Sequence, residues 1–143
     1  MATQFSEIYS LFVVQIDDYE WKQLTREQLE AVAQKYLLNA LLTVQDVVTN
    51  IYDFDLEAGH FNSDFEYPEK LLLAKAMKLE WVKEKKYSLE LMRKSLGDRD
   101  FKATQGYPYL NSLTGVEAAL EKEIRTHLIR NSFRGAVRGG GMI

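Results

Sequence analysis

Apolar residues recur every three or four positions along most of this chain of 143 residues, and no other feature restricts its fold as strongly. This spacing places apolar side chains on one stripe of an α-helix, whereas a half-buried strand requires alternation. The clearest run comprises Leu110, Leu113, Val116, Leu120, Ile124 and Leu128. It predicts a long helix that ends near Ser132. We therefore expect an all-α fold.

Two further helices are expected in the first third of the chain. The earlier one begins near Phe5, although the dense apolar run over residues 11–14 would also suit a strand. The later one opens with Thr25 and Gln28, whose spacing is that of a capping box, in which each side chain satisfies a free backbone N–H of the other residue. Its apolar face continues to Ile51, so we expect this helix to form the centre of the core.

Two more helices and a connector are expected in the middle of the chain. Pro68 suits a first helical turn, and the helix that it opens is predicted to run to Lys86. Ser88 is placed to cap a separate short helix, which Gly97 ends. The stretch 98–108 is then predicted to be a connector without a helix of its own.

The helical pattern is broken over residues 52–67. The segment YDFDLEAGHFNSDFEY combines acids, aromatics and a glycine, which predicts a loop or short hairpin packed by its own aromatic rings. The whole pattern indicates a single-domain bundle of about five helices over residues 1–132. A basic, glycine-rich tail over residues 133–143 is expected to be flexible.

The composition excludes several classes of protein. The sequence lacks cysteine, so it has no disulfide framework, no thiolate metal site and no cysteine nucleophile. No basic segment precedes an apolar run as in a secretion signal, and the apolar stretches are shorter than the roughly 20 residues that cross a bilayer. We expect a soluble protein of the cytoplasm that does not contact a membrane.

Charge is divided unequally between the two halves of the chain. Residues 1–69 contain three basic and thirteen acidic side chains, a balance of −10, whereas residues 70–143 contain fifteen basic and eight acidic ones, a balance of +7. Two solvated faces that happen to differ would explain this division. Alternatively, identical copies stack acidic half against basic half, as a ring requires. The sequence leaves both interpretations open.

The residues that usually carry catalysis form no recognisable pattern. His127 lies close to the apolar face of the last predicted helix, which is typical of a core or rim histidine. Acids surround His60, but their spacing does not match the calcium-binding loop. Glycine motifs that bind phosphate are absent, as is the nucleophile elbow of hydrolases. We expect no enzymatic activity, no cofactor and no metal site.

The last fourteen residues, 130–143, are basic and rich in glycine. They contain three arginines, four glycines and no acid. They could be a disordered spacer, a peptide that becomes ordered in a partner's groove, or a contact to RNA or DNA, with arginines on phosphates and Phe133 on a base. The sequence pI of about 5.5 and the acidic first half argue against nucleic acid.

The segment KLEWVKEKKYSLELMRKSLGDRDFKATQGYPYLNSLTGVEAALEKEIRTHLIRNSFR contains a helix end at Trp81-Val82, a leucine-rich stretch over 89–92 and a closing helix over 121–129. Ser95-Leu96 and Asp100-Phe101 lie in the connecting region. With the opening FSEIYSLFVVQIDDYEWKQLTREQLE, this order of elements resembles the small helical neck proteins of tailed bacteriophages. Those proteins are head-to-tail connectors, also described as neck adaptors or head-completion proteins.

The resemblance implies a structural virion protein. It would form a ring, expected to be twelve-fold, beneath the dodecameric portal protein. It would extend the channel through which genomic DNA passes without specific binding, and dock the next neck or tail-completion protein. Its location would be the virion neck, and the host cytoplasm during assembly. The tail would insert into a neighbouring protein through Arg130, Phe133, Arg134, Val137 and Arg138. The alternative is a small helical nucleic-acid-binding or regulatory protein that uses the arginine-rich tail.

Overall fold

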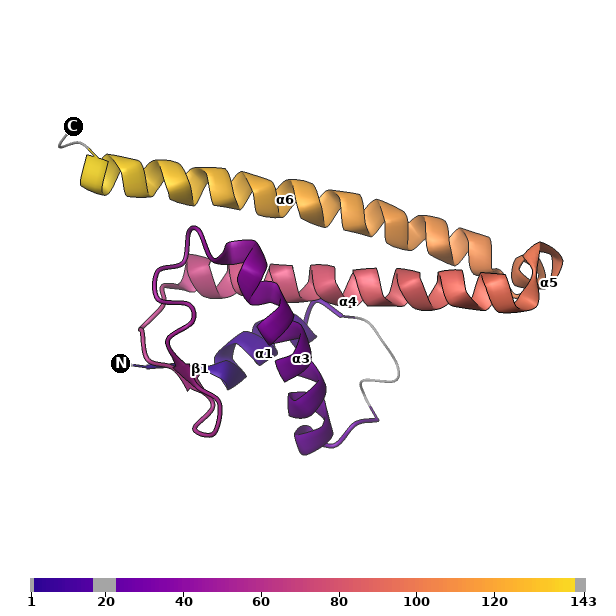
Figure 1. The fold of residues 1–143 in the computed structure, drawn as a ribbon, viewed down its shortest axis with the longest axis horizontal. Coiled ribbons are helices and arrows are strands. Elements are labelled where there is room, and N and C mark those ends of the chain that lie inside the picture. Colours follow the sequence, from indigo (N-terminus) through magenta and orange to yellow (C-terminus); the bar gives the residue numbers. More distant parts are fainter. Residues whose placement is uncertain (1, 17–22, 141–143) are drawn as a thin grey trace.

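The structure is a computed structural model that describes residues 2–16 and 23–140, the side chains of 131–140 excepted. Within this part of the chain it contains five helices and a sheet of three two-residue strands. The helices are α1 (Phe5–Val13), α3 (Arg26–Val44), α4 (Tyr67–Leu96), α5 (Asp98–Ala103) and α6 (Gly106–Gly140) (Figure 1). The prediction of an all-α bundle is confirmed.

Helices α4 and α6 form an antiparallel pair that spans the length of the molecule (Figure 1). At 1.5 Å per residue, the 30 residues of α4 extend over about 45 Å and the 35 residues of α6 over about 52 Å. Helices α1 and α3 pack against the N-terminal part of α4 and enclose the core with it. The most deeply buried side chains include Ile8, Phe12, Leu37, Leu72 and Met77.

The rest of the α4–α6 pair extends beyond α1 and α3 as a two-helix arm closed by α5 (Figure 1). We call residues 85–109 the helical arm. It begins just after the ion pair between Lys35 of α3 and Glu84 of α4, whose atoms Nζ and Oε2 are 2.9 Å apart. The start of the arm is joined to the following part of α6, since Lys86 Nζ donates to Glu117 Oε1 at 3.0 Å. The protein therefore consists of a compact body and a projecting arm.

The capping box at the start of α3 is present as predicted. The backbone N–H of Gln28 donates to Thr25 Oγ1 at 3.2 Å, and the N–H of Thr25 donates to Gln28 Oε1 at 3.0 Å. Helix α3 ends at Val44, however, and not at Ile51. Val48 and Ile51 are still buried, because the turns over residues 45–52 keep them against the core.

The segment 52–67 forms the expected short hairpin, and an additional strand joins it. Strands β2 (Phe54–Asp55) and β3 (His60–Phe61) are antiparallel, and β1 (Thr3–Gln4) pairs with the other edge of β3. The aromatic packing is also confirmed: the ring of Phe61 lies 4.9 Å from that of Phe5 and 5.0 Å from that of Phe65, measured between centroids. This small sheet anchors the start of the chain to the body.

Helix α4 is one element, so the prediction of separate helices over 68–86 and 88–96 is wrong. Neither glycine nor proline occurs between Pro68 and Gly97, and nothing therefore stops the helix at Lys86. Ser88 lies in the helix interior, where it caps nothing. Gly97 ends α4 with a φ of 85°, as a terminal glycine can.

The predicted connector contains a helix of its own, α5, and leads directly into α6. Gln105 has a φ of 64° at the turn between the two helices, and α6 begins at Gly106, with Pro108 in its first turn. The α6 backbone continues to Gly140, past the expected end near Ser132. The flexibility of residues 133–143 stays a prediction.

Candidate interaction surfaces

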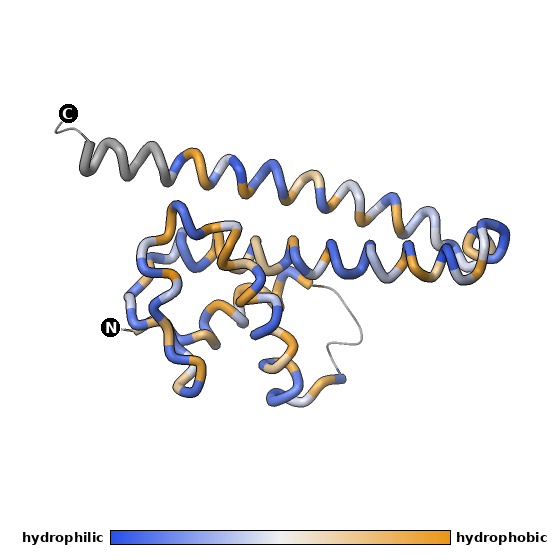
Figure 2. The backbone as a smooth tube through the Cα atoms, viewed as in Figure 1, coloured by the Kyte–Doolittle hydropathy of each residue, from blue (hydrophilic) through white to orange (hydrophobic). Residues whose placement is uncertain are grey.

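The helical arm carries an exposed apolar surface on α4. Tyr87 is 65% exposed, Leu91 48%, Met92 43% and Leu96 41%. We call Tyr87 and Leu91, which lie four residues apart on one stripe of α4, the arm patch. Tyr87 and Leu91 lie away from α6, because Lys86 and Arg93 of α4 are the residues that reach α6 across the arm. Met92 and Leu96 lie on the other flank of α4, since Leu96 is about 180° around the helix from Tyr87. Hydrophobic segments recur along α4 as far as its C-terminal end (Figure 2). Isolated exposed apolar residues are common, but Tyr87 and Leu91 are neighbours on one exposed stripe, which makes this face of α4 a candidate contact surface.

The end of the arm is fixed by a small polar cluster. Asp98 Oδ1 accepts hydrogen bonds from Tyr107 Oη at 2.7 Å and from Arg93 Nε at 3.3 Å. The hydrogen bond from Tyr107, and then the guanidinium of Arg93, lower the pKa of Asp98. The same bond raises the pKa of Tyr107. Asp98 is exposed, and Arg93 and Tyr107 are half-buried, so water screens the cluster and its main effect is to hold the ends of α4, α5 and α6 in a fixed geometry.

A groove lies between α1 and α3 on the body. It encloses about 410 Å³ and is lined on its apolar side by Tyr9, Val13, Val14 and Leu29. A neighbouring hollow of about 490 Å³ shares Tyr9, Arg26 and Glu30 with it and extends to Leu56, Glu57 and Glu27. We call the two together the α1–α3 groove. Val14 is 81% exposed at its mouth. The groove is therefore an apolar trough whose rim carries the acids Glu27, Glu30 and Glu57 and one base, Arg26, which pairs with Glu30.

Tyr9 forms part of the wall of both hollows and is almost completely buried. Burial, with a smaller contribution from the charge of Glu30, raises the pKa of its hydroxyl to about 12. The ring is held by Phe5, whose centroid lies 6.2 Å away. A neutral, packed tyrosine makes this wall of the groove a rigid surface, and it gives no sign of acid–base chemistry.

His127 lies at the contact between α4 and α6. His127 Nε2 lies 3.3 Å from Lys75 Nζ, and Lys75 also donates to Glu123, so the three residues join α4 to α6. Burial, and then the charge of Lys75, lower the pKa of His127. The interpretation of His127 as a rim histidine fits this position. Lys75 was not predicted as its neighbour, because it lies 52 residues earlier in the sequence.

The acids around His60 serve the hairpin turn. Asp55 Oδ1 accepts from the backbone N–H of Ala58 at 3.0 Å, and Asp53 Oδ1 accepts from the side-chain amide of Asn62 at 2.8 Å. His60 Nδ1 is buried without a hydrogen-bond partner. Among the residues that the structure describes, no group of three or more histidine, aspartate or glutamate side chains is arranged to hold a metal ion.

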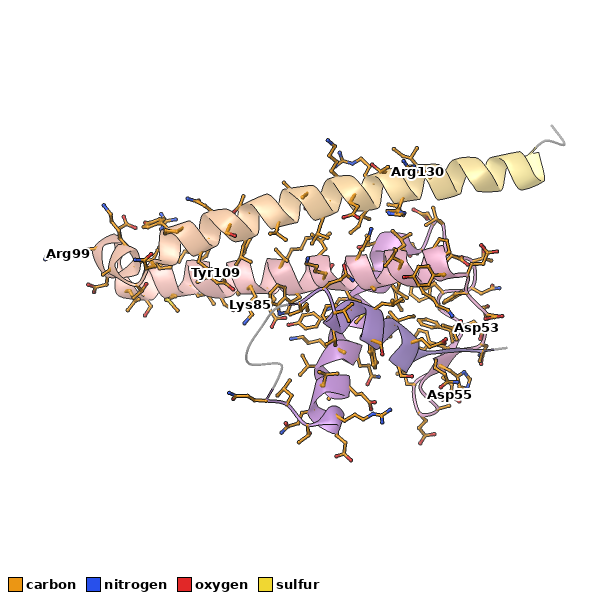
Figure 3. The ribbon with its side chains drawn as sticks, turned by 180° about the vertical axis from the view of Figure 1, so that it is seen from behind. Asp53, Asp55, Lys85, Arg99, Tyr109 and Arg130 are labelled. Carbon is orange, nitrogen blue, oxygen red and sulfur yellow. The ribbon has the colours of Figure 1, made fainter. Side chains whose placement is uncertain are left out.

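The charge division seen in the sequence is also a division in space. Before α4, the described residues 2–16 and 23–66 contain two basic and nine acidic side chains, whereas the helical arm contains six basic and three acidic ones. Figure 3 shows Asp53 and Asp55 at one end of the molecule and Arg99 at the other. The two ends of a single copy are thus electrostatically complementary.

The predicted partner-binding residues lie on the last turns of α6. Arg130 is exposed and labelled on α6 in Figure 3, and Ile129 beside it is 63% exposed. The side chains of Phe133, Arg134, Val137 and Arg138 lie outside the described residues. The positions 129, 133 and 137 recur every four residues, as do 130, 134 and 138, and on a helical backbone each set shares one stripe. Ile129 was missed in the sequence because it lies about 100° around the helix from Leu128 and so off the apolar stripe that predicted this helix.

Comparison with known proteins finds no match among family models, curated proteins or solved structures. None of the described helices is both long and apolar enough to cross a membrane. The candidate site is therefore a set of surfaces: the arm patch, the α1–α3 groove and the C-terminal turns of α6.

Proposed function

We propose that this chain is a structural connector of a tailed-bacteriophage neck. Copies form a ring beneath the portal protein, extend the DNA channel and dock the next neck or tail-completion protein. The observation that carries the proposal is helix α6, which runs past the N-terminal end of α4 and has no acidic residue after Glu123 (Figure 1). The resemblance in residue pattern to neck adaptors supports the same function.

The C-terminal part of α6 suits insertion into a neighbouring protein. Ile129 and Arg130 are exposed on α6, and the apolar and basic stripes continue through Phe133, Val137, Arg134 and Arg138 in the sequence. An amphipathic helix of this kind binds in an apolar groove with acids at its edge. One such contact is weak on its own, but repetition around a ring adds avidity.

The acidic body has a place in the same proposal. DNA must pass through the channel of a connector without being retained, and a negative lining repels phosphates. The body supplies that lining if its face with Asp53 and Asp55 is turned to the channel. A channel lined by Lys75, Lys78 and Lys83 would contradict this orientation.

The decisive experiment is cross-linking mass spectrometry on purified phage particles that contain this chain. We expect cross-links from residues 130–143 to the portal protein. In the test variant, Arg130, Arg134 and Arg138 are replaced by glutamate, which reverses their charges. This variant should fold normally but should no longer attach to the portal protein. A matched control reverses Lys122 and Arg125, which are also exposed on α6. Absence of the chain from particles, or normal attachment of the test variant, would contradict the proposal.

One observation favours a second function. Arg125 and Arg130 are exposed, and every charged side chain after Glu123 is basic. This arrangement also suits phosphate contacts in a nucleic-acid-binding or regulatory protein. Salt separates the two functions. Affinity for DNA or RNA falls steeply with salt in proportion to the number of phosphates contacted, whereas binding through an apolar helix face weakens less. Binding measured at two salt concentrations therefore decides between them.

A further inference from the structure

The arm patch is a convex apolar helix face with basic residues in line. Along α4, Lys83, Tyr87, Leu91 and Lys94 follow one another at intervals of four, four and three, so they lie on one stripe. Lys83 and Lys94 are exposed, and neither forms an ion pair or hydrogen bond with the described residues. The patch therefore offers apolar side chains between two available positive charges.

The α1–α3 groove has the reciprocal properties. It is concave, it is lined by Tyr9, Val13 and Leu29, and Val14 stands exposed at its mouth. On its rim, Glu27 and Glu57 are exposed and make no ion pair with the described part of the chain. A helix laid between α1 and α3 would complete a three-helix packing arrangement and would bring its basic residues close to these acids.

We propose that copies of this chain associate head to tail, with the arm patch of one copy seated in the α1–α3 groove of the next. The occupant is a second copy because one chain carries both surfaces, and they match in shape, apolar character and charge. Each contact leaves one free patch and one free groove, so the association forms a ring where the rotation between copies closes and extends as a filament where it does not. This inference rests on the proposed connector function, since it names the contact that would build its ring.

The test uses one disabling substitution on each surface. Leu91→Glu places a charge in the arm patch, and Val14→Glu places one at the groove mouth. Both positions are exposed, so both variants should fold, which circular dichroism and thermal melting check. Leu42→Glu is the matched control, because Leu42 is 67% exposed on α3 and lines neither surface. Sedimentation velocity over a range of concentrations measures association.

A head-to-tail contact predicts a specific pattern. Wild type and Leu42→Glu should form the same oligomers, whereas Leu91→Glu and Val14→Glu should each be monomeric, with association weakened about tenfold or more. A mixture of the two disabled variants should form a one-to-one dimer and nothing larger, because it contains one intact patch and one intact groove. Association by either disabled variant alone, or a monomeric wild type at every concentration, would overturn the proposal.

A second measurement detects weak association. Because the sequence has no cysteine, Val14→Cys and Leu91→Cys can be made as separate single-cysteine chains and mixed under oxidising conditions. We expect the mixed disulfide dimer to form faster than either symmetric dimer. Predominance of the Leu91→Cys symmetric dimer would show an arm-to-arm contact and overturn the proposal. Failure here leaves the connector function intact, which depends on cross-links to the portal in particles.

Discussion

Gly106 lies directly against the ring of Phe101, and a Cβ atom at position 106 would stand 2.5 Å from two of the ring carbons. Phe101 is fully buried, and its ring also packs edge-on against Tyr107 at 4.8 Å between centroids. The turn into α6 thus requires glycine at position 106 because the Phe101 ring lies so close to its Cα atom. The φ angle of Gly106 is not positive, so the backbone conformation alone does not require glycine.

Gly106→Ala should therefore destabilise the end of the helical arm. The added methyl group forces the Phe101 ring to move, and overpacking of this kind costs about 1–3 kcal/mol. Urea unfolding measures the loss. Gly115→Ala is the control, because a Cβ at 115 meets nothing within 4 Å and α6 is helical there. That control should be neutral or stabilising, and equal losses in both variants would contradict the packing explanation.

Ser88→Ala tests the continuity of α4. In the interior of a helix, alanine is the better residue, so the substitution should raise the free energy of unfolding by a few tenths of a kcal/mol. At an N-cap, the same change would lower it by about 1 kcal/mol. The sign of the change measured by chemical denaturation therefore distinguishes one helix from two.

Thr25→Ala should remove the capping box of α3. The N–H of Gln28 then loses its acceptor, and we expect a loss of about 1 kcal/mol in the free energy of unfolding. Thr25→Ser keeps the hydroxyl and should retain most of the stability. Chemical denaturation of both variants provides the measurement, and an equal loss in the two would argue against the hydroxyl as the cause.

Phe61→Ala should be the most damaging of these substitutions. Its ring is fully buried and touches Phe5, Phe54 and Phe65, so truncation leaves a cavity where β1 and β3 meet. The expected loss is about 3–5 kcal/mol. Phe61→Leu, which retains most of the volume, should lose clearly less. Thermal and urea unfolding of the two variants measure the difference.

Stability should decrease as the pH falls below the ordinary pKa of histidine. The pKa of His127 is lowered from 6.5 in the folded protein by burial and by Lys75. As the pH falls, the histidine of the unfolded chain therefore takes up its proton before His127 of the folded protein does. The free energy of unfolding decreases as the pH falls from the ordinary pKa of histidine to the lower pKa of folded His127. His127→Gln should flatten the dependence of unfolding free energy between about pH 7 and about pH 5. If the free energy of unfolding of this variant depends on pH as steeply as that of the wild type, groups other than His127 cause the dependence.

Much of the fold could be predicted from local patterns, and the surfaces could not. The stripe from Leu110 to Leu128 and the Thr25–Gln28 pair act within one helix, where spacing alone determines geometry. By contrast, the pairing of Thr3 with Phe61 joins residues far apart in sequence. The α1–α3 groove likewise depends on how two separate helices pack. The prediction that two helices occupy the range of α4 was wrong. Ser88 follows a run of lysines and resembles an N-cap, but no glycine or proline stands there to end the preceding helix.

Helix α4 connects the body to the arm as one uninterrupted rod, which fixes the angle between the groove and the patch. Each residue added to the rod between Trp81 and Tyr87 would turn the patch by about 100° and advance it by about 1.5 Å. If copies dock as proposed, the rotation from one copy to the next is set by this count of residues. The register of a single helix would then determine how many subunits close the circle.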